Sequence, residues 1–265
     1  ATVSIVSDDT SDSPFTFAIE GFAYSDNANL SALTLSSGTL TPAFNSNTTA
    51  YTATVSNSTE SVTVTPSAQS TVATIQARVN AGSYASVTSG SPSNSLALSI
   101  GANTVDILVT AEDGITTKTY TVTVTRQSAF ADWAAANGLP TDPNANGGAN
   151  LQRFAFGLDP NGTSMNPVVI NGSGDLVNDG FPTVNVQKSA SSFTYNALFT
   201  RRKDWAAAGL TFTIQFSGDL THWVTSTATP TPIASDADSE AVVVRYPFFV
   251  NGKKAQFFRV IVNTP

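Results

Sequence analysis

The stretch Tyr120-Thr-Val-Thr-Val-Thr-Arg126 decides the fold, because apolar and hydroxyl side chains alternate along it without a break. Successive side chains of a β-strand point to opposite faces. Tyr120, Val122 and Val124 therefore share one face, and the threonines share the other. A strand with this pattern buries one face and leaves the other in water. The stretch predicts a half-buried strand that closes a β-sheet domain.

The same alternation recurs upstream, from Leu30 onward, between segments rich in turn-forming residues. The apolar sets predicted to face the core are Leu33 and Leu35; Tyr51, Ala53 and Val55; Val62 and Val64; Ala73, Ile75, Ala77 and Val79; Leu96, Leu98 and Ile100; and Val105, Ile107 and Val109. Turn segments such as Gly101-Ala-Asn103 and Glu112-Asp-Gly114 separate them. With the closing strand this makes seven short strands in about 100 residues, which is typical of an immunoglobulin-like β-sandwich.

Five motifs follow one another in this region. They are Leu30-Ser-Ala-Leu-Thr-Leu-Ser-Ser-Gly-Thr-Leu-Thr-Pro-Ala-Phe44, Tyr51-Thr-Ala-Thr-Val55, Gly101-Ala-Asn-Thr-Val105, Ala111-Glu-Asp-Gly114 and the closing strand. In this order they resemble the bacterial cadherin-like β-sandwich domain over about residues 29–126. The resemblance implies a non-catalytic repeat module of large surface or secreted proteins. It does not imply calcium-dependent adhesion, because the family name refers to the fold.

Composition excludes several classes of protein. The 265 residues suggest two domains, at roughly 150 residues each. A net charge of −7 argues against nucleic-acid binding, which needs clustered Lys and Arg. The absence of cysteine excludes disulfides and thiolate metal sites. Because no apolar stretch approaches about 18 residues and the first residues do not form a signal peptide, we expect neither a membrane-spanning segment nor a leader.

Changes in periodicity divide the all-β chain into four predicted segments. They are an N-terminal strand segment at 1–28, the sandwich at 29–126, a helix-loop-helix connector at 127–165 and a second all-β domain at 166–265. In the connector, Ser128 is placed to cap a first helix that ends near Gly138. Asn150 is the expected N-cap of a second helix, which Gly157 terminates.

The loop between these helices has the spacing of an EF-hand-type calcium loop. Asp142, Asn144, Asn146 and Asn150 occupy relative positions 1, 3, 5 and 9, with Gly147 at position 6 and Gly148 at position 7, where a backbone carbonyl coordinates the ion. Position 12 departs from the pattern, because it holds Arg153 instead of a bidentate carboxylate. We therefore favour a loop held by its own amide hydrogen bonds, with bound calcium as the alternative.

The connector and the C-terminal domain also contain motifs of a second kind. Trp133-Ala-Ala-Ala-Asn-Gly-Leu139, Phe154-Ala-Phe-Gly-Leu-Asp-Pro160 and Phe216-Ser-Gly-Asp-Leu-Thr-His-Trp223 resemble C-terminal regions of large secreted bacterial proteins. That resemblance implies a module without an assigned activity. Its usual loop carries more aspartates and ends in glutamate, so Arg153 weakens the transfer of a metal site to this chain.

The C-terminal domain is rich in aromatic residues at strand spacing. The residues expected to face its core are Val168 and Ile170; Val184 and Val186; Phe193 and Tyr195; Phe212, Ile214 and Phe216; Val242 and Val244; and Phe258, Val260 and Val262. A carbohydrate-binding face, on which such rings stack against sugars, is the alternative. Aromatic residues at this spacing usually belong to the core, so the core is favoured.

The N-terminal segment Ser13-Pro-Phe-Thr-Phe-Ala-Ile-Glu-Gly21 alternates Phe15, Phe17 and Ile19. It resembles the last strand of an immunoglobulin-like domain of bacterial surface proteins. An isolated apolar strand is unstable in water, so we expect it to dock on its own domain or to complete a sheet in a neighbouring subunit. Phe15, Phe17 and Ile19 are the predicted strand-addition interface.

The search for catalytic residues yields none. His222 is the only histidine, in a predicted strand beside Trp223, and no serine elbow or acid partner accompanies it. We therefore expect a non-catalytic structural or adhesive protein, secreted or on a bacterial cell surface. It would be a cell-surface or filament-forming subunit that associates with itself or with neighbouring domains of the same protein. The alternative is a spacer, anchor or glycan-binding accessory region of a larger secreted enzyme.

Overall fold

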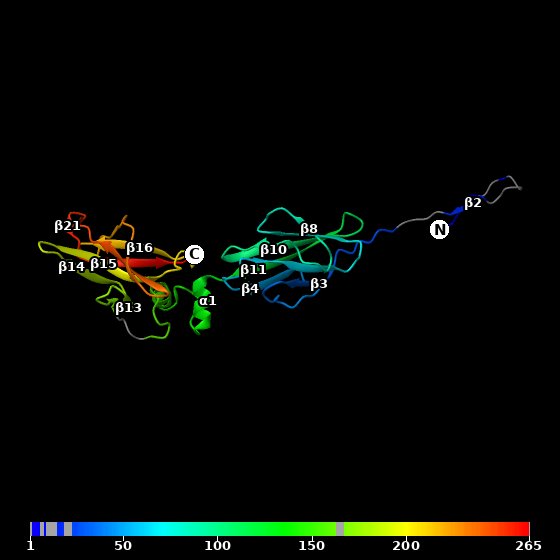
Figure 1. Ribbon diagram of the computed structural model, residues 1–265. Coiled ribbons are helices and arrows are strands. Elements are labelled where there is room, and N and C mark those ends of the chain that lie inside the picture. The colour runs from blue at the N-terminus through cyan, green and yellow to red at the C-terminus, as the bar shows by residue number, and fades with distance from the viewer. Residues whose placement is uncertain (1, 6–7, 9–14, 19–22, 163–166, 265) are drawn as a thin grey trace. The chain divides into compact units, whose positions relative to one another are not determined.

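The computed structural model describes residues 2–5, 8, 15–18, 23–162 and 167–264 (Figure 1). The chain forms two compact units. The first comprises Ala1–Thr54, Glu60–Leu98 and Ala102–Val124, and the second comprises Val55–Thr59, Ser99–Gly101 and Thr125–Pro265. Strands predominate in both. Within the described residues the only α-helices are α1 (Ala129–Ala136) and α2 (Ala149–Phe156), which confirms the predicted all-β fold class.

The first unit is built on a five-stranded sheet. Its strands, in order across the sheet, are β4 (Ala50–Val55), β11 (Thr117–Arg126), β10 (Gly101–Thr110), β7 (Thr74–Val79) and β8 (Ala85–Val87). Two strand pairs complete the sandwich, β3 (Leu30–Leu35) with β6 (Val64–Ala68) and β5 (Ser61–Val62) with β9 (Leu96–Ala97). The Tyr120 hydroxyl of β11 accepts a hydrogen bond from the Leu30 N–H of β3, which links the two layers.

The core of the first unit follows the predicted alternation. Buried and exposed residues alternate strictly along β4, and Tyr120, Val122 and Val124 of β11 are fully buried. Four residues predicted to face the core, Leu35, Ala73, Val79 and Ile100, are only partly buried. Leu30 is buried although it is out of phase with Leu33, because the register of β3 against β6 shifts between Leu30 and Ala32. A bulge of this kind changes the face on which a side chain lies.

The N-terminal residues form a small separate pairing. β1 (Thr2–Ile5) and β2 (Phe15–Ala18) run antiparallel, with Ile5 opposite Phe15 and Val3 opposite Phe17. They make a two-stranded sheet that no other described strand joins. Ile19, the third residue of the predicted interface, lies outside the described residues.

Both helices belong to the second unit, and their ends follow local chemistry. The Ser128 side chain accepts a hydrogen bond from the Ala131 N–H, which confirms the predicted cap of α1. The prediction that Asn150 caps α2 is wrong. The helix begins after Gly148, whose left-handed φ of 79° turns the chain, and Asn150 lies inside the first turn. Buried side chains of both helices, including Phe130 and Phe154, pack against Ala208 and Leu210 of the same unit.

Two sheets form the β-structure of the second unit. The first has the order β14 (Thr183–Lys188), β15 (Phe193–Arg202), β19 (Ser239–Arg245) and β18 (Thr231–Ser235). The second has the order β17 (Val224–Thr225), β16 (Thr211–Ser217) and β22 (Phe257–Asn263). Two short pairs accompany them, β12 (Val169–Ile170) with β13 (Leu176–Asn178) and β20 (Phe249–Val250) with β21 (Lys253–Lys254).

The core of this unit lies between the two sheets, with Phe156 of α2 packed into it. It contains Ala197, Phe199, Ile214, Phe216, Val242, Val244 and Val250. The prediction that Val184, Val186, Phe193 and Tyr195 belong to the core is wrong, because all four are exposed. They lie on β14 and on the beginning of β15, where one end of the four-stranded sheet carries no covering layer over these side chains.

Candidate functional site

The calcium-type loop of the second unit is a tight left-handed turn. The Asp142 Oδ1 atom accepts a hydrogen bond from the Asn144 N–H at 2.9 Å. Asn146, Gly147 and Gly148 then adopt positive φ values of 54°, 67° and 79°. This hydrogen bond is compatible with a self-held turn and with a calcium site. It holds the turn through Oδ1, and it does not involve the second carboxylate oxygen, Oδ2. Asp142, Asn144 and Asn146 are exposed.

Asn150 and Arg153 occupy positions 9 and 12 of this loop. Asn150 is only 6% exposed, and its Nδ2 atom is buried without a hydrogen-bond partner in the described part of the chain. The Arg153 guanidinium donates to the backbone carbonyl of Asp159 at 3.0 Å, within the segment that follows α2. The donor set therefore holds one carboxylate, from Asp142, and otherwise neutral amides and the Gly148 carbonyl. Calcium affinity rises with the number of charged ligands, so this set fits a weak site at most.

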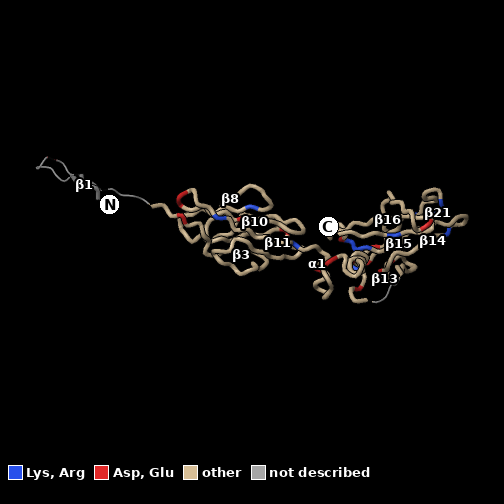
Figure 2. Tube along the Cα trace, turned by 180° about the vertical axis from the view of Figure 1, so that it is seen from behind, with Lys and Arg blue, Asp and Glu red and all other residues tan. Residues whose placement is uncertain are grey.

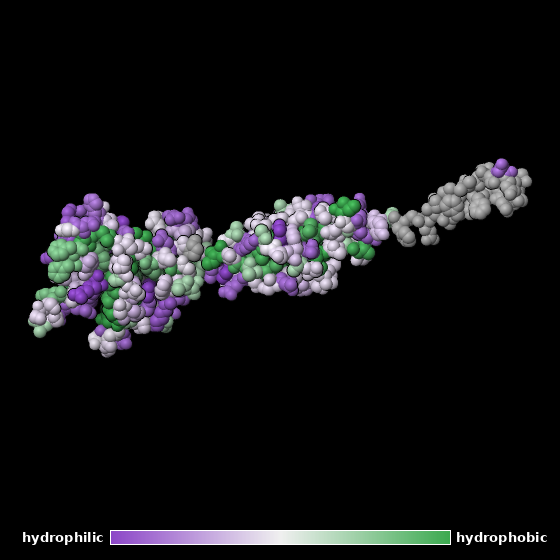
Figure 3. Space-filling view, turned by 90° about the horizontal axis from the view of Figure 1, so that it is seen from above, coloured by the Kyte–Doolittle hydropathy of each residue, from purple (hydrophilic) through white to green (hydrophobic). Residues whose placement is uncertain are grey.

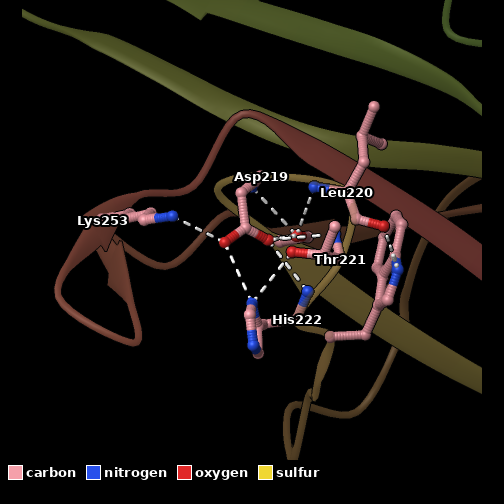
Figure 4. Close-up of polar contacts among 7 residues, drawn as sticks. Asp219, Leu220, Thr221, His222 and Lys253 are labelled. Atoms are coloured by element: carbon pink, nitrogen blue, oxygen red, sulfur yellow. Dashed lines mark hydrogen bonds and ion pairs between the residues drawn. The ribbon is translucent and has the colours of Figure 1, made fainter.

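The histidine predicted to be structural lies in a polar turn, not in a strand (Figure 4). The Asp219 Oδ1 atom accepts hydrogen bonds from the Thr221 and His222 N–H groups at 3.0 and 2.8 Å. The Asp219 Oδ2 atom contacts His222 Nδ1 at 3.1 Å and Lys253 Nζ at 2.7 Å. The bond from Lys253, followed by the backbone bond from His222, lowers the pKa of Asp219 far below its usual range.

This turn brings together a histidine, a carboxylate and a hydroxyl, but the geometry differs from that of a catalytic triad. The Thr221 hydroxyl and the Asp219 carboxylate both contact the same imidazole nitrogen, Nδ1. A triad needs the nucleophile on one ring nitrogen and the acid on the other. The His222 side chain is also 72% exposed, so it lies outside any enclosed pocket. The cluster is therefore best explained as an Asx-type turn that holds the loop after β16.

A second group of acids lies beside the C-terminal end of α2. Asp179, Asp236 and Asp238 line one hollow of about 550 Å³ together with Arg202 and Lys203. Burial, followed by the charge of Asp236, raises the pKa of Asp179 to about 6. The described residues contain no group of three acidic, histidine or cysteine side chains placed to hold a metal ion. The neighbouring cations make this hollow a mixed-charge surface.

Comparison with known proteins identifies the first unit. The profile of the family described as "Cadherin-like beta sandwich domain" matches residues 30–127. These residues are a cadherin-like β-sandwich domain, as the order of motifs predicted. A relative of similar sequence is a "Putative membrane protein" of Evansella cellulosilytica, 41% identical over 103 residues. The matched part covers 39% of this chain and 15% of the relative, so the likeness concerns a small portion of a much longer protein.

The two described α-helices have eight residues each, and neither has the length and apolar character needed to cross a membrane.

Sequence reasoning assigned the aromatic residues at the uncovered end of the four-stranded sheet to the core and kept a carbohydrate-binding face as the alternative. Phe193 is 59% exposed there, and Phe248 of the nearby loop is 79% exposed. The signal that could have found this exposed surface is the pairing of a lysine with these rings. Lys188 stands opposite Phe193 in the register of β14 and β15, and its Nζ atom lies 6.0 Å from the ring centroid. A lysine on the strand face predicted to be buried indicates that this end of the strand is exposed to solvent.

Proposed function

We propose that this chain is a non-catalytic structural or adhesive part of a bacterial surface or secreted protein. The match of residues 30–127 to the cadherin-like β-sandwich supports a structural module, because the core of such a domain is packed by alternating apolar side chains. The low content of charged side chains, 12%, fits a module whose solubility rests on hydroxyl and amide groups. Its role is to carry load and to hold partners.

We further propose that the N-terminal strand β2 mediates self-association by strand addition. The observation that carries this is the two-stranded β1–β2 sheet, which pairs with no other described strand. A strand paired on one side only presents a row of free N–H and C=O groups on its other side. An isolated two-stranded hairpin is marginally stable in water, so joining a third strand stabilises it.

Electron microscopy of the purified chain tests this assembly. The full chain should form fibres or short chains, and deletion of residues 1–25 should leave monomers. The double variant F15S/F17S should weaken assembly because the two-residue period of a strand assigns both residues to one face, whereas T16S, at the alternate position, is the matched control. Persistent monomers from the intact chain would disprove strand addition and leave the load-bearing or spacer role.

The second candidate function is a spacer or accessory region of a larger secreted protein. The observation that favours it is the relative from Evansella cellulosilytica, in which the matched part is only 15% of the length. A spacer needs only to fold and to resist unfolding. Atomic-force pulling of several copies of residues 23–265 fused in tandem should then show two unfolding events per copy, and a single event would contradict two independent units.

A further inference from the structure

The second unit has an apolar sheet face that its own fold leaves uncovered. In the β14–β15–β19 register, Val184 stands opposite Ala197, and Ala197 stands opposite Val244. Ala197 and Val244 are fully buried in the core, whereas Val184 is exposed. Val186 stands opposite Tyr195 on the same face, two residues further along each strand, and both are exposed. The apolar face that is buried at β15 and β19 is therefore exposed to solvent at the edge strand β14.

Two adjoining hollows lie at this end of the unit. One, of about 510 Å³, is lined by Val184, Phe193 and Tyr195, and by Phe248 of the loop after β19. The other, of about 460 Å³, is lined by Phe249 and by the hydroxyl side chains of Thr225, Ser226 and Thr227. Arg245, Tyr246 and Pro247 line both, so the two hollows share this short segment as a wall. We call the two hollows together the aromatic groove.

The floor of the aromatic groove is preformed. The Tyr246 ring packs against Phe216, with centroids 4.8 Å apart, and against Phe258, with centroids 5.8 Å apart. Phe216 is buried in the core, so Tyr246 is fixed from below. Apolar surface gathers at this end of the unit, at the left in Figure 3. A groove of this kind is ready to bind without a large ordering cost.

The charge of the aromatic groove is opposite to that of the whole chain. Lys254 lines it, as does Arg245, whose side chain the register places on the face of β19 opposite that of Val244, and no Asp or Glu is found among the described residues of either hollow. Neither cation makes an ion pair within the part of the chain that the structure describes. Lys188 adds a third positive charge beside Phe193. Figure 2 shows basic segments near the labels β14 and β21, in a chain of net charge −7.

We propose that the aromatic groove binds an extended acidic polysaccharide of the uronic-acid type. Exposed rings of Phe193, Tyr195 and Phe248 offer flat apolar surfaces to the C–H faces of sugar rings. The Lys254 and Lys188 ammonium groups donate charge-assisted hydrogen bonds to the carboxylates. The hydroxyl and amide side chains of the groove bind sugar hydroxyls. The two adjoining hollows suit a chain of several sugars.

A polysaccharide fits this groove better than a peptide or a lipid surface does. Anionic membranes attract clusters of four to eight Lys and Arg, at about 1 kcal/mol each, and two or three cations fall short of that. An acidic peptide has no array of C–H faces to stack on four exposed aromatic rings. The neutral polar lining of Thr194, Gln256 and Asn251 matches a ligand rich in hydroxyls. The proposal rests on the adhesive part of the proposed function, for which it names the ligand.

Affinity electrophoresis of the full chain tests the proposal. Polygalacturonate in the gel should retard the protein, and fully methyl-esterified pectin, which keeps the sugar backbone without its charges, should retard it much less. The variant K188Q/K254Q should weaken retardation by polygalacturonate about tenfold, because two charge-assisted hydrogen bonds are lost. K203Q is the charge control, because Lys203 is exposed and lines the acidic hollow beside α2 instead of the aromatic groove. F248S should also weaken binding, with exposed Tyr24 as the site of the aromatic control, Y24S.

Several results would overturn the proposal. Equal retardation by neutral and acidic polymers, or unchanged retardation of K188Q/K254Q, would disprove recognition of uronates. Stronger binding to poly-glutamate or to vesicles of anionic lipid would assign the groove to those partners. If sedimentation shows self-association of the wild type and none of F248S, the aromatic groove is an interface between copies of the chain. Filament formation through residues 1–25 is measured separately, so its failure does not affect this result.

Discussion

The hydroxyl group of Tyr120 accepts a hydrogen bond from the backbone N–H of Leu30 at 3.0 Å, although the two residues lie 90 positions apart. The same hydroxyl donates to the backbone carbonyl of Ser46 at 2.8 Å. Both Tyr120 and Leu30 are fully buried, so the N–H of Leu30 has no access to water. The Tyr120 side chain of the closing strand thus supplies the hydrogen-bond partner of a buried backbone N–H at the start of the domain.

Replacement of Tyr120 by Phe should destabilise the first unit by about 1–3 kcal/mol, because it leaves the buried Leu30 N–H without a partner. Calorimetry of the full chain should show a lower melting temperature for one transition. The tryptophan fluorescence transition should not move, because Trp133, Trp205 and Trp223 all lie in the second unit. Y24F, at an exposed tyrosine, is the matched control. Equal stability of the two variants would contradict the role of the hydroxyl.

Gly157, which ends α2, should not tolerate a side chain. Its φ is 74°, and a Cβ atom there would collide with the Ser239 hydroxyl and lie 3.1 Å from the Asp179 Oδ2 atom. Gly138, which follows α1, has a similar φ of 67° but open space around it. We expect G157A to lower the stability of the second unit by about 2–4 kcal/mol and G138A by about 1 kcal/mol, measured by urea unfolding with tryptophan fluorescence. Similar losses of stability in G157A and G138A would show that the positive φ alone causes the destabilisation, without a contribution from the collision with Ser239.

Asp179 should make the second unit less stable at neutral pH than at acid pH. Its folded-state pKa of about 6 lies above the ordinary value of 3.8, so the folded state disfavours the carboxylate. The penalty is absent below about pH 4 and complete above the folded-state pKa. A shift of this size corresponds to about 3 kcal/mol, which solvent screening at a partly exposed site reduces to about 1–2 kcal/mol.

The variant D179N tests this pH dependence. At pH 7.5 its tryptophan-monitored melting temperature should exceed that of the wild type, and at pH 4 the two should coincide. D26N, at an exposed aspartate of the first unit, should leave this transition unchanged at both pH values. A constant difference between D179N and the wild type across the pH range would contradict the assignment to ionisation.

The loop Asp142–Asn150 distinguishes a self-held turn from a calcium site. Because its donor set has one carboxylate, we expect a chelator to leave the melting temperature of the second unit unchanged. D142A should lower stability by about 0.5–1.5 kcal/mol through loss of the bond to the Asn144 N–H, with or without calcium. A melting temperature that rises with millimolar calcium in the wild type and not in D142A would establish the calcium alternative for Asp142, Asn144, Asn146, Gly148 and Asn150.

The first domain was predictable because its signals are local. The alternation of Tyr120, Val122 and Val124 specifies a strand with one buried face, and the structure buries all three. Ser128 predicted its helix cap for the same reason, since the capping hydroxyl and the Ala131 N–H are three residues apart. Asn150 failed as a cap because glycine at 148 adopts the left-handed backbone and starts the helix ahead of it.

The sequence by itself determined which residues share a face, because the two-residue period of a strand follows from covalent geometry. Only the tertiary structure decided which faces are covered. Val184 and Val244 lie on the same face of one sheet, yet one is exposed and the other buried, because cover depends on another layer folded from distant residues. Phe193 and Tyr195 therefore became the wall of a groove instead of a core, which no local pattern in their own strand encodes.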